Sequence, residues 1–188
     1  MSEQPLLQII VGSTRPGRAG IAIAKWFYDI ASARDDFEVE LVDLAEVNLP
    51  LYDEPIHPIK REYVHEHTLN WSHIIDRADA YVFVIPEYNH SMNAASKNAI
   101  DYLHWEWVYK PYSIVCYGGA SMGLRAATAI KPPLDQLQMT WCGDVSIPLM
   151  TTPVVDGVFK ANDILVGASA KVLDELATFT PLLKQLRS

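Results

Sequence analysis

Short apolar runs alternate with longer segments of helical periodicity along this chain. Residues 6–11 (LLQIIV) form an almost continuous apolar run of strand length, which is typical of a strand buried on both faces of a parallel sheet. Similar runs predict four further strands at residues 37–42, 80–85, 112–117 and 145–149. Apolar residues at helical spacing predict helices at residues 20–33, 64–77, 94–105, 124–137 and 163–187.

The regular succession of strand and helix indicates an open, doubly wound parallel sheet, because right-handed crossovers place helices on both of its faces. With five strands we expect a flavodoxin-like three-layer α/β/α fold with the strand order 2-1-3-4-5. No repeat or low-complexity linker interrupts the sequence, so residues 1–188 are predicted to form a single domain. Ligands of such sheets bind beyond the carboxyl ends of the strands, which directs attention to the segments after strands one, three and four.

Composition excludes several classes of function. The 188 residues include 15 Lys and Arg against 23 Asp and Glu, a formal net charge of −8, and no basic run. We therefore expect no nucleic-acid partner and no binding to an anionic membrane surface. No secretory signal or bilayer-spanning stretch is visible, and Cys116 and Cys142 form no CxxC pair. These features predict a cytoplasmic protein in a reducing compartment.

The segment after the first strand, residues 12–20 (GSTRPGRAG), opens directly into a helix. Backbone N–H groups, the hydroxyls of Ser13 and Thr14, and the guanidinium of Arg15 or Arg18 could surround an anion there. The segment lacks the Gly-Lys-Ser/Thr of a P-loop and the G-x-G-x-x-G of a dinucleotide fold. A single terminal phosphate, as in FMN, fits better, and the alternative is a generic turn with a Ser or Thr cap.

Two further segments have ligand-binding character. Residues 86–101 combine a proline, an aromatic side chain, amides and small residues, a surface suited to a planar heteroaromatic ring with hydrogen-bonding edges. The alternative is a polar loop that solvates the next helix, in which Lys97 is a surface residue. Residues 118–123 (GGASMG) allow close backbone approach, and their N–H groups can hold a carbonyl or a developing anion.

Other conspicuous residues favour plainer interpretations. The histidines at positions 57, 65, 67 and 73 lack metal-ligand spacing with a carboxylate or cysteine, and they are expected on the surface. Cys116 lies in an apolar strand and is expected to pack as a small hydrophobic residue. The five tryptophans, with Trp71, Trp105, Trp107 and Trp141 placed in or next to helices, suit either the core or a subunit interface, for which Tyr52 and Trp105 are candidate walls.

Four motifs in order resemble the NADPH-dependent FMN reductase family of flavodoxin-like proteins. They are GSTRPGRAG at residues 12–20, LPLYDEP at 49–55, PEYNHS…KNAIDYL at 86–103 and YGGASMG at 117–123. The element His104-Trp105-Glu106-Trp107 is similar to one shared by the small quinone, azo-dye and chromate reductases. The resemblance extends to about the last strand. The chain departs from the family where Asn93-Ala94-Ala95-Ser96-Lys97 replaces the usual Pro-Gly or Pro-Ala followed by x-Leu-Lys.

The resemblance implies a set of cofactor-binding residues and no catalytic or metal-binding residue. It implies that Ser13, Arg15 and the backbone around Gly20 and Ile21 hold the FMN phosphate. The isoalloxazine would be lined by Pro86, Glu87, Tyr88 and Asn89. The pyrimidine side of the ring would contact Gly118, Gly119 and Ser121.

The expected activity is an NAD(P)H-dependent reductase that passes hydride through FMN to flavin, quinone or a similar small acceptor by a ping-pong mechanism. NADPH or NADH would be the donor, and the resemblance implies a homodimer or homotetramer. Two alternatives compete. A non-enzymatic flavodoxin-like electron carrier suits the acidity of the chain but gains nothing from an open glycine-rich site. A signalling receiver domain needs an acidic phosphoacceptor after strand three, where this chain has Pro86-Glu87.

Overall fold

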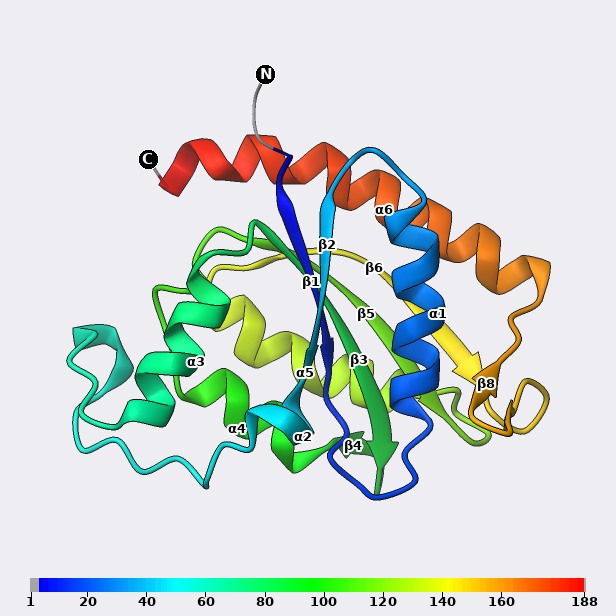
Figure 1. Cartoon of the computed structure of the whole chain (residues 1–188), viewed down its shortest axis with the longest axis horizontal. Helices are drawn as coiled ribbons and strands as arrows, with labels where there is room; N and C mark the ends of the chain where they lie inside the picture. Colours follow the sequence, from blue (N-terminus) through cyan, green and yellow to red (C-terminus); the bar gives the residue numbers. More distant parts are fainter. Residues whose placement is uncertain (1–3, 188) are drawn as a thin grey trace.

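The computed structural model describes residues 4–187, and its centre is a sheet of five parallel strands (Figure 1). They are β1 (Leu6–Val11), β2 (Glu38–Asp43), β3 (Ala80–Tyr88), β5 (Pro111–Gly118) and β6 (Thr140–Pro148), and they lie in the order β2-β1-β3-β5-β6. The two-residue strand β4 (Ser91–Met92) pairs antiparallel with the end of β3. Without β4 the order is 2-1-3-4-5, so the predicted topology is confirmed.

Helices cover both faces of the sheet. One face carries α1 (Gly20–Ser32) and α6 (Asp163–Lys184). The other carries α3 (Glu66–Asp76), α4 (Ala94–Asp101) and α5 (Leu124–Gln136). The short elements are α2 (Leu44–Val47), η1 (Pro58–Lys60), η2 (Gln185–Arg187) and the hairpin of β7 (Val154–Val155) with β8 (Val158–Phe159). Within the described residues, no helix is long and apolar enough to cross a membrane.

The two faces of the sheet form two separate apolar clusters. Along β3, Val82 and Val84 pack on the side of α1 and α6, whereas Phe83 and Ile85 pack on the side of α3, α4 and α5. Successive side chains of a strand point to opposite faces, and both faces are covered, so a central strand is apolar at most positions; Gln8 on β1 and Ser113 on β5 are buried polar exceptions. This explains the continuous apolar runs from which the strands were predicted.

The predicted helix at residues 94–105 ends earlier, at Asp101. The following turn buries the carboxylate of Glu106, which accepts hydrogen bonds from Ser72 (2.6 Å), Tyr63 (3.0 Å) and Arg61 (3.1 Å). These bonds satisfy a fully buried charge and fasten the long connection between α2 and α3. A helix that continued through position 106 would lose these hydrogen bonds. The spacing of apolar residues in the sequence does not reveal such a network.

The tryptophans divide between core and surface. Trp71 and Trp107 are fully buried and pack edge to face, with ring centroids 6.2 Å apart. Trp105 and Trp141 are each 48% exposed. Trp141 lies on β6, which begins five residues before the predicted strand, and the Nζ of Lys131 in α5 lies 3.9 Å from its ring centroid. Cys116 is a fully buried free thiol in the apolar cluster, as predicted.

Asp79 fastens the C-terminal helix to the amino end of the sheet. Its carboxylate accepts from the Leu6 backbone N–H at 3.2 Å and forms ion pairs with Lys184 and Arg187, both at 3.0 Å. Burial alone would raise the pKa of Asp79, but the hydrogen bonds from Lys184 and Leu6 and the nearby positive charges lower it below its ordinary value.

We expect Asp79→Asn to lower the free energy of unfolding by about 1–3 kcal/mol at pH 7, because it removes a charged acceptor. A depressed carboxylate pKa stabilises the fold above the unfolded-state pKa and ceases to do so as pH falls through the folded value. The difference between wild type and variant should therefore begin to decline near pH 4 and vanish only below the lowered folded-state pKa of Asp79. Urea unfolding of both proteins at several pH values measures this difference in the free energy of unfolding. The control is Asp174→Asn, whose exposed carboxylate pairs with Arg34; an equal loss there would contradict the prediction.

Candidate functional site

The loops after β1, β3 and β5 meet at the carboxyl edge of the sheet, at the lower end of the molecule in Figure 1. The Ser13 hydroxyl lies 3.0 Å from the Tyr88 hydroxyl, which joins the first loop to the second. The Glu87 carboxylate accepts from the Arg125 backbone N–H at 3.1 Å, which joins the second to the third. The structure therefore brings all three predicted segments into one site.

The first loop presents the uncapped N-terminus of α1. Ala19 occupies the N-cap position and offers no side-chain acceptor, and the first turn has no acidic residue. The first N–H groups of a helix have no intrahelical partners and carry partial positive charge, so this end attracts an anion. Gly20 and Ile21, both predicted to bind phosphate through their backbone, are the first two residues of the helix.

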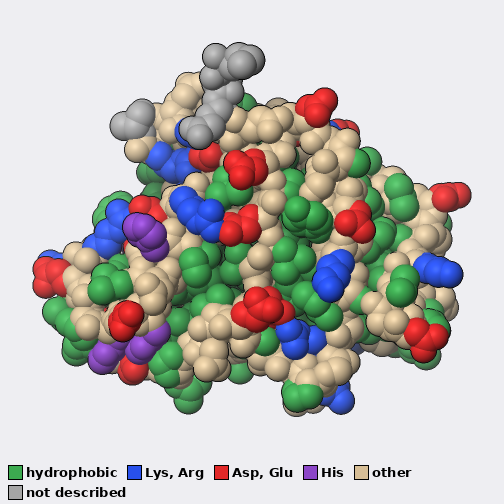
Figure 2. Space-filling view, viewed as in Figure 1, with side chains coloured by type: hydrophobic (Ala, Val, Ile, Leu, Met, Phe, Trp, Pro, Cys, Tyr) green, Lys and Arg blue, Asp and Glu red, His purple; other side chains and the backbone are tan. Residues whose placement is uncertain are grey.

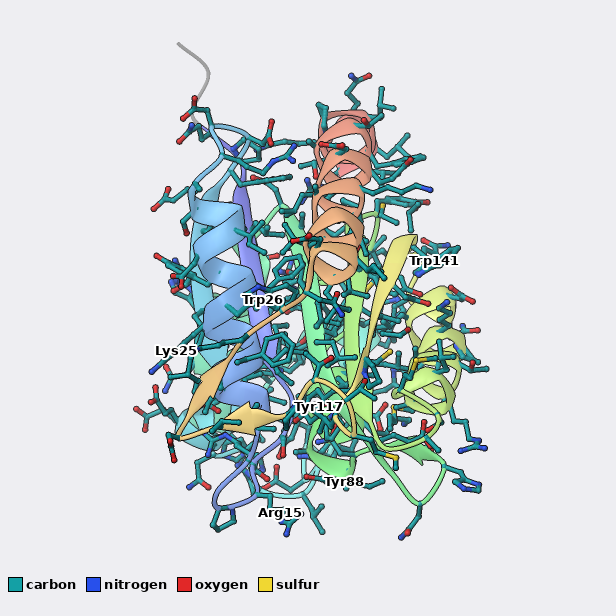
Figure 3. All side chains as sticks on the ribbon, turned by 90° about the vertical axis from the view of Figure 1, so that its right-hand side faces the viewer. Arg15, Lys25, Trp26, Tyr88, Tyr117 and Trp141 are labelled. Carbon is teal, nitrogen blue, oxygen red and sulfur yellow. The ribbon has the colours of Figure 1, made fainter. Side chains whose placement is uncertain are left out.

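The two arginines of this loop differ in their surroundings. Arg18 forms an ion pair with the buried carboxylate of Asp43, so its charge is already neutralised. Arg15 is exposed at the tip of the loop (Figure 3) and makes no ion pair with any of the described residues. Arg15, rather than Arg18, therefore has its guanidinium available for an incoming anion.

Tyr117, near the end of β5, packs directly against the start of α1. A Cβ atom on Gly20 would lie 2.6 Å from the Tyr117 hydroxyl oxygen, so only glycine allows this approach. Ser13 is fully buried beside it. Figure 3 shows Tyr117, Tyr88 and Arg15 at the same end of the molecule. The prediction did not include Tyr117, although it lies in the YGGASMG motif, because an aromatic residue at the end of an apolar strand suggests core packing.

The PEYN segment forms the end of β3 and a tight hairpin. Pro86 is buried within the strand, and Tyr88 pairs with Ser91 of β4. The two residues between them, Asn89 and His90, have φ values of 49° and 66°. Two consecutive left-handed residues between antiparallel strands are typical of a type I′ turn, which holds the side chains on either side of it rigidly. The turn leaves Tyr88 40% exposed beside the first loop.

Glu87 has a different position from its neighbours. Its carboxylate side chain is only 7% exposed, and it accepts from both the backbone and the guanidinium of Arg125, each at 3.1 Å. Burial opposes ionisation, but hydrogen bonds from Ser121 and Arg125 lower the pKa of Glu87 below its ordinary value. The carboxylate thus caps the start of α5 and connects the loop of residues 118–123 to β3. Nothing in the sequence predicted that Arg125 takes part in this connection.

The glycines of the third loop have distinct roles. Gly123 has φ +85°, and a Cβ there would lie 2.4 Å from the Tyr117 backbone nitrogen. Gly118 accepts from the Leu149 backbone N–H at 2.9 Å. Gly119 is exposed, and an added Cβ would meet no atom within 4 Å. Gly123 therefore shapes the loop, whereas Gly119 presents open backbone beside the half-buried Ser121.

Asn93 and Ser96 occupy the positions where the chain departs from the family pattern. The Asn93 side chain donates to the Gly12 carbonyl at 2.7 Å and accepts from the Ser96 hydroxyl at 2.8 Å. All three groups are buried. These bonds connect the start of the first loop to the start of α4, so side-chain hydrogen bonds hold this junction.

Two hollows flank the first loop. One, of about 430 Å³, lies among α2, α4 and Thr14, with walls that include Asn48, Leu51 and Asn98. The other, of about 570 Å³, lies between the start of α1 and the β7–β8 hairpin. Both have the size of small-molecule pockets. Lys97 pairs with Asp101 at 2.5 Å on the outer side of α4 and is 45% exposed, in agreement with its predicted surface position.

Elsewhere on the surface, positively and negatively charged side chains are mixed. On the face shown in Figure 2, Lys and Arg side chains alternate with Asp and Glu, and histidines gather to one side. His67 pairs with Asp53 at 3.0 Å, and its ring stacks on that of His65. Among residues 4–187, no group of three or more His, Cys, Asp or Glu side chains has the arrangement of a metal site.

The fold is that of a flavodoxin-like protein, and the uncapped start of α1 lies at the carboxyl edge of its sheet. Residues 5–151 match the family model for NADPH-dependent FMN reductase. The chain belongs to this family.

Relatives and solved structures agree with this assignment. An NAD(P)H-dependent FMN reductase of Nectria sp. is 33% identical over 187 residues, with 96% of this chain and 92% of the relative covered. A Pseudomonas putida quinone reductase is 32% identical, with 74% of each chain covered. In fold, the chain resembles the flavoenzyme NAD(P)H:(acceptor) oxidoreductase FerB from Paracoccus denitrificans, with a TM-score of 0.71, 22% identity, and 93% and 98% of the two chains covered.

We expect Gly123→Ala to lower the free energy of unfolding by about 3 kcal/mol, because left-handed strain adds to a clash with backbone that cannot move aside. The matched control is Gly119→Ala in the same loop, where the added methyl group meets open space. Chemical denaturation of both variants measures the effect. Equal stabilities would show that the loop does not depend on the close contact of Gly123 with Tyr117.

Proposed function

We propose that this protein is an FMN-containing oxidoreductase that transfers hydride equivalents from NAD(P)H to flavin, quinone or similar small acceptors. Family membership supports the enzyme class and the cofactors FMN and NAD(P)H. The observation that carries the proposal is one loop that holds the uncapped start of α1, the buried Ser13 hydroxyl and the exposed Arg15, unpaired among the described residues, beside two glycine-rich or aromatic loops. Such a site suits a monophosphate joined to a flat ring.

The residues present fit FMN. The phosphate would be held by Ser13, Arg15 and the backbone of Gly20 and Ile21, where positive charge meets little competing negative charge. The ring would lie against the end of β3 and the loop of residues 118–123. Bound FMN supplies the hydride chemistry, so the chain needs only to orient the ring and donate hydrogen bonds to it.

The same geometry suits a ping-pong reaction. Gly119 offers open backbone at the rim, and Tyr88 is 40% exposed, so one side of the site is accessible. Donor and acceptor would then occupy the same position in turn, and a variety of acceptors would be tolerated. The cytoplasmic location and the single domain at residues 1–188 stay predictions.

To test the function, the purified protein is loaded with FMN, and its visible spectrum is recorded before and after NADPH is added without air. We expect the flavin bands to bleach, and to return when a quinone is added. Initial rates at several quinone concentrations should give parallel double-reciprocal lines. Bands that persist would indicate an electron carrier, and failure to bind FMN would contradict the proposed function.

A substitution tests whether Arg15 binds the FMN phosphate. Arg15→Ala should weaken FMN binding about tenfold, because one charge-assisted contact is lost, and should leave riboflavin binding unchanged. Quenching of flavin fluorescence measures both. The control is Lys25→Ala. It removes an equal charge from the exposed side of α1, the helix that follows the loop, at a position away from the start of that helix (Figure 3). If both variants bind FMN as the wild type does, Arg15 does not contact the phosphate.

We also propose that the protein forms a homodimer or homotetramer. Tyr52 and Ile59 are exposed apolar residues in the lining of a hollow of about 450 Å³ between η1, α4 and α5, and the exposed Trp105 donates to the Ile59 carbonyl at 2.8 Å. Light scattering should give a multiple of the 21.1 kDa chain mass. Ile59→Glu should shift that mass toward the monomer. The control is Val158→Glu on the β7–β8 hairpin, and a monomeric wild type would contradict the proposal.

A further inference from the structure

The hydroxyl of Tyr117 is buried beside the Ser13 hydroxyl and the Gly20 backbone N–H, yet no group in the described part of the chain stands in hydrogen-bonding geometry to it. The residue is only 5% exposed, and its oxygen lies against the Cα of Gly20, the first residue of α1. Ser13, whose own hydroxyl contacts Tyr88, is also fully buried at this site. Three hydroxyls, those of Ser13, Tyr88 and Tyr117, thus gather at the positive end of one helix.

An unpartnered hydroxyl of this kind destabilises the folded chain, because burial removes its hydrogen bonds to water. Burial raises the pKa of Tyr117 well above its ordinary value, so the hydroxyl keeps its proton. A protonated phenol beside helix N–H groups can donate to an anion bound there. Arg18 of the same loop is already paired with Asp43.

We propose that Tyr117 is a phosphate-binding residue: its hydroxyl donates to the terminal phosphate of FMN, between the N–H groups of α1 and the Ser13 hydroxyl. This inference rests on the proposed function. The absence of a side chain at Gly20 is part of the same arrangement, because any Cβ there would displace the Tyr117 ring from the start of the helix. Tyr117 thereby adds a contact that FMN makes and riboflavin, which lacks the phosphate, does not.

The test is Tyr117→Phe, which keeps the packed ring and removes only the hydroxyl. Affinities for FMN and for riboflavin are measured by flavin fluorescence quenching on the full chain after bound flavin has been removed. We expect FMN binding to weaken about 10- to 100-fold, the range for a hydrogen bond to a charged group, and riboflavin binding to stay the same. The flavin-free variant should be at least as stable as the wild type in thermal unfolding, because an unsatisfied polar group is gone.

The chain offers a close control in Tyr112, on the same strand. Its hydroxyl is also buried without a partner of hydrogen-bonding geometry, but it lies five residues away, about 17 Å along β5. Tyr112→Phe should therefore leave both affinities unchanged. Any general effect of removing a buried phenol hydroxyl from β5 would appear in both variants and would overturn the assignment.

The outcomes separate this inference from the proposed function. If the wild type binds FMN and Tyr117→Phe binds it equally well, Tyr117 does not contact the phosphate, and the proposed function is unaffected. If FMN and riboflavin binding fall together, the hydroxyl supports the site as a whole, and the inference is wrong. If the wild type binds neither flavin, the proposed function itself fails.

Discussion

Burial of both faces of the parallel sheet is the constraint on which the rest of this structure depends. The central strands β1, β3 and β5 lie between two helical layers, so their side chains are mostly apolar and closely packed, with Gln8 and Ser113 as buried polar exceptions. The loops that can hold a ligand therefore lie beyond the strand ends. At the carboxyl edge, the chain leaves β1, β3 and β5 through three loops that must lie side by side, because the strands themselves are neighbours.

Close contacts made by the backbone at two glycines then join the three adjacent loops into one site. Gly20 lets the Tyr117 ring reach the start of α1, and Gly123 lets the third loop fold back onto the backbone of β5. Hydrogen bonds of Asn93 to Gly12 and of Glu87 to Arg125 lock these contacts from the two helices that follow. The result is a rigid framework around an uncapped helix start, which is the arrangement that a preorganised anion site requires.

Side-chain hydrogen bonds hold the junction between the first loop and α4. Asn93 donates to the Gly12 carbonyl and accepts from the Ser96 hydroxyl, and all three groups are buried. Satisfied buried polar groups of this kind specify one conformation, because any other arrangement leaves them unpaired. The connection between the first loop and α4 therefore depends on side-chain chemistry in this protein.

The sequence by itself determined the sheet order, the helices and the three loops, because apolar periodicity and glycine spacing are local properties of the chain. It placed Ser13, Arg15, Tyr88 and Gly119 in segments that the fold brings together. Only the tertiary structure decided which arginine is paired, that Glu87 caps α5, and that Tyr117 meets Gly20. These depend on distances between residues far apart in the sequence, such as positions 20 and 117, and no local pattern encodes them.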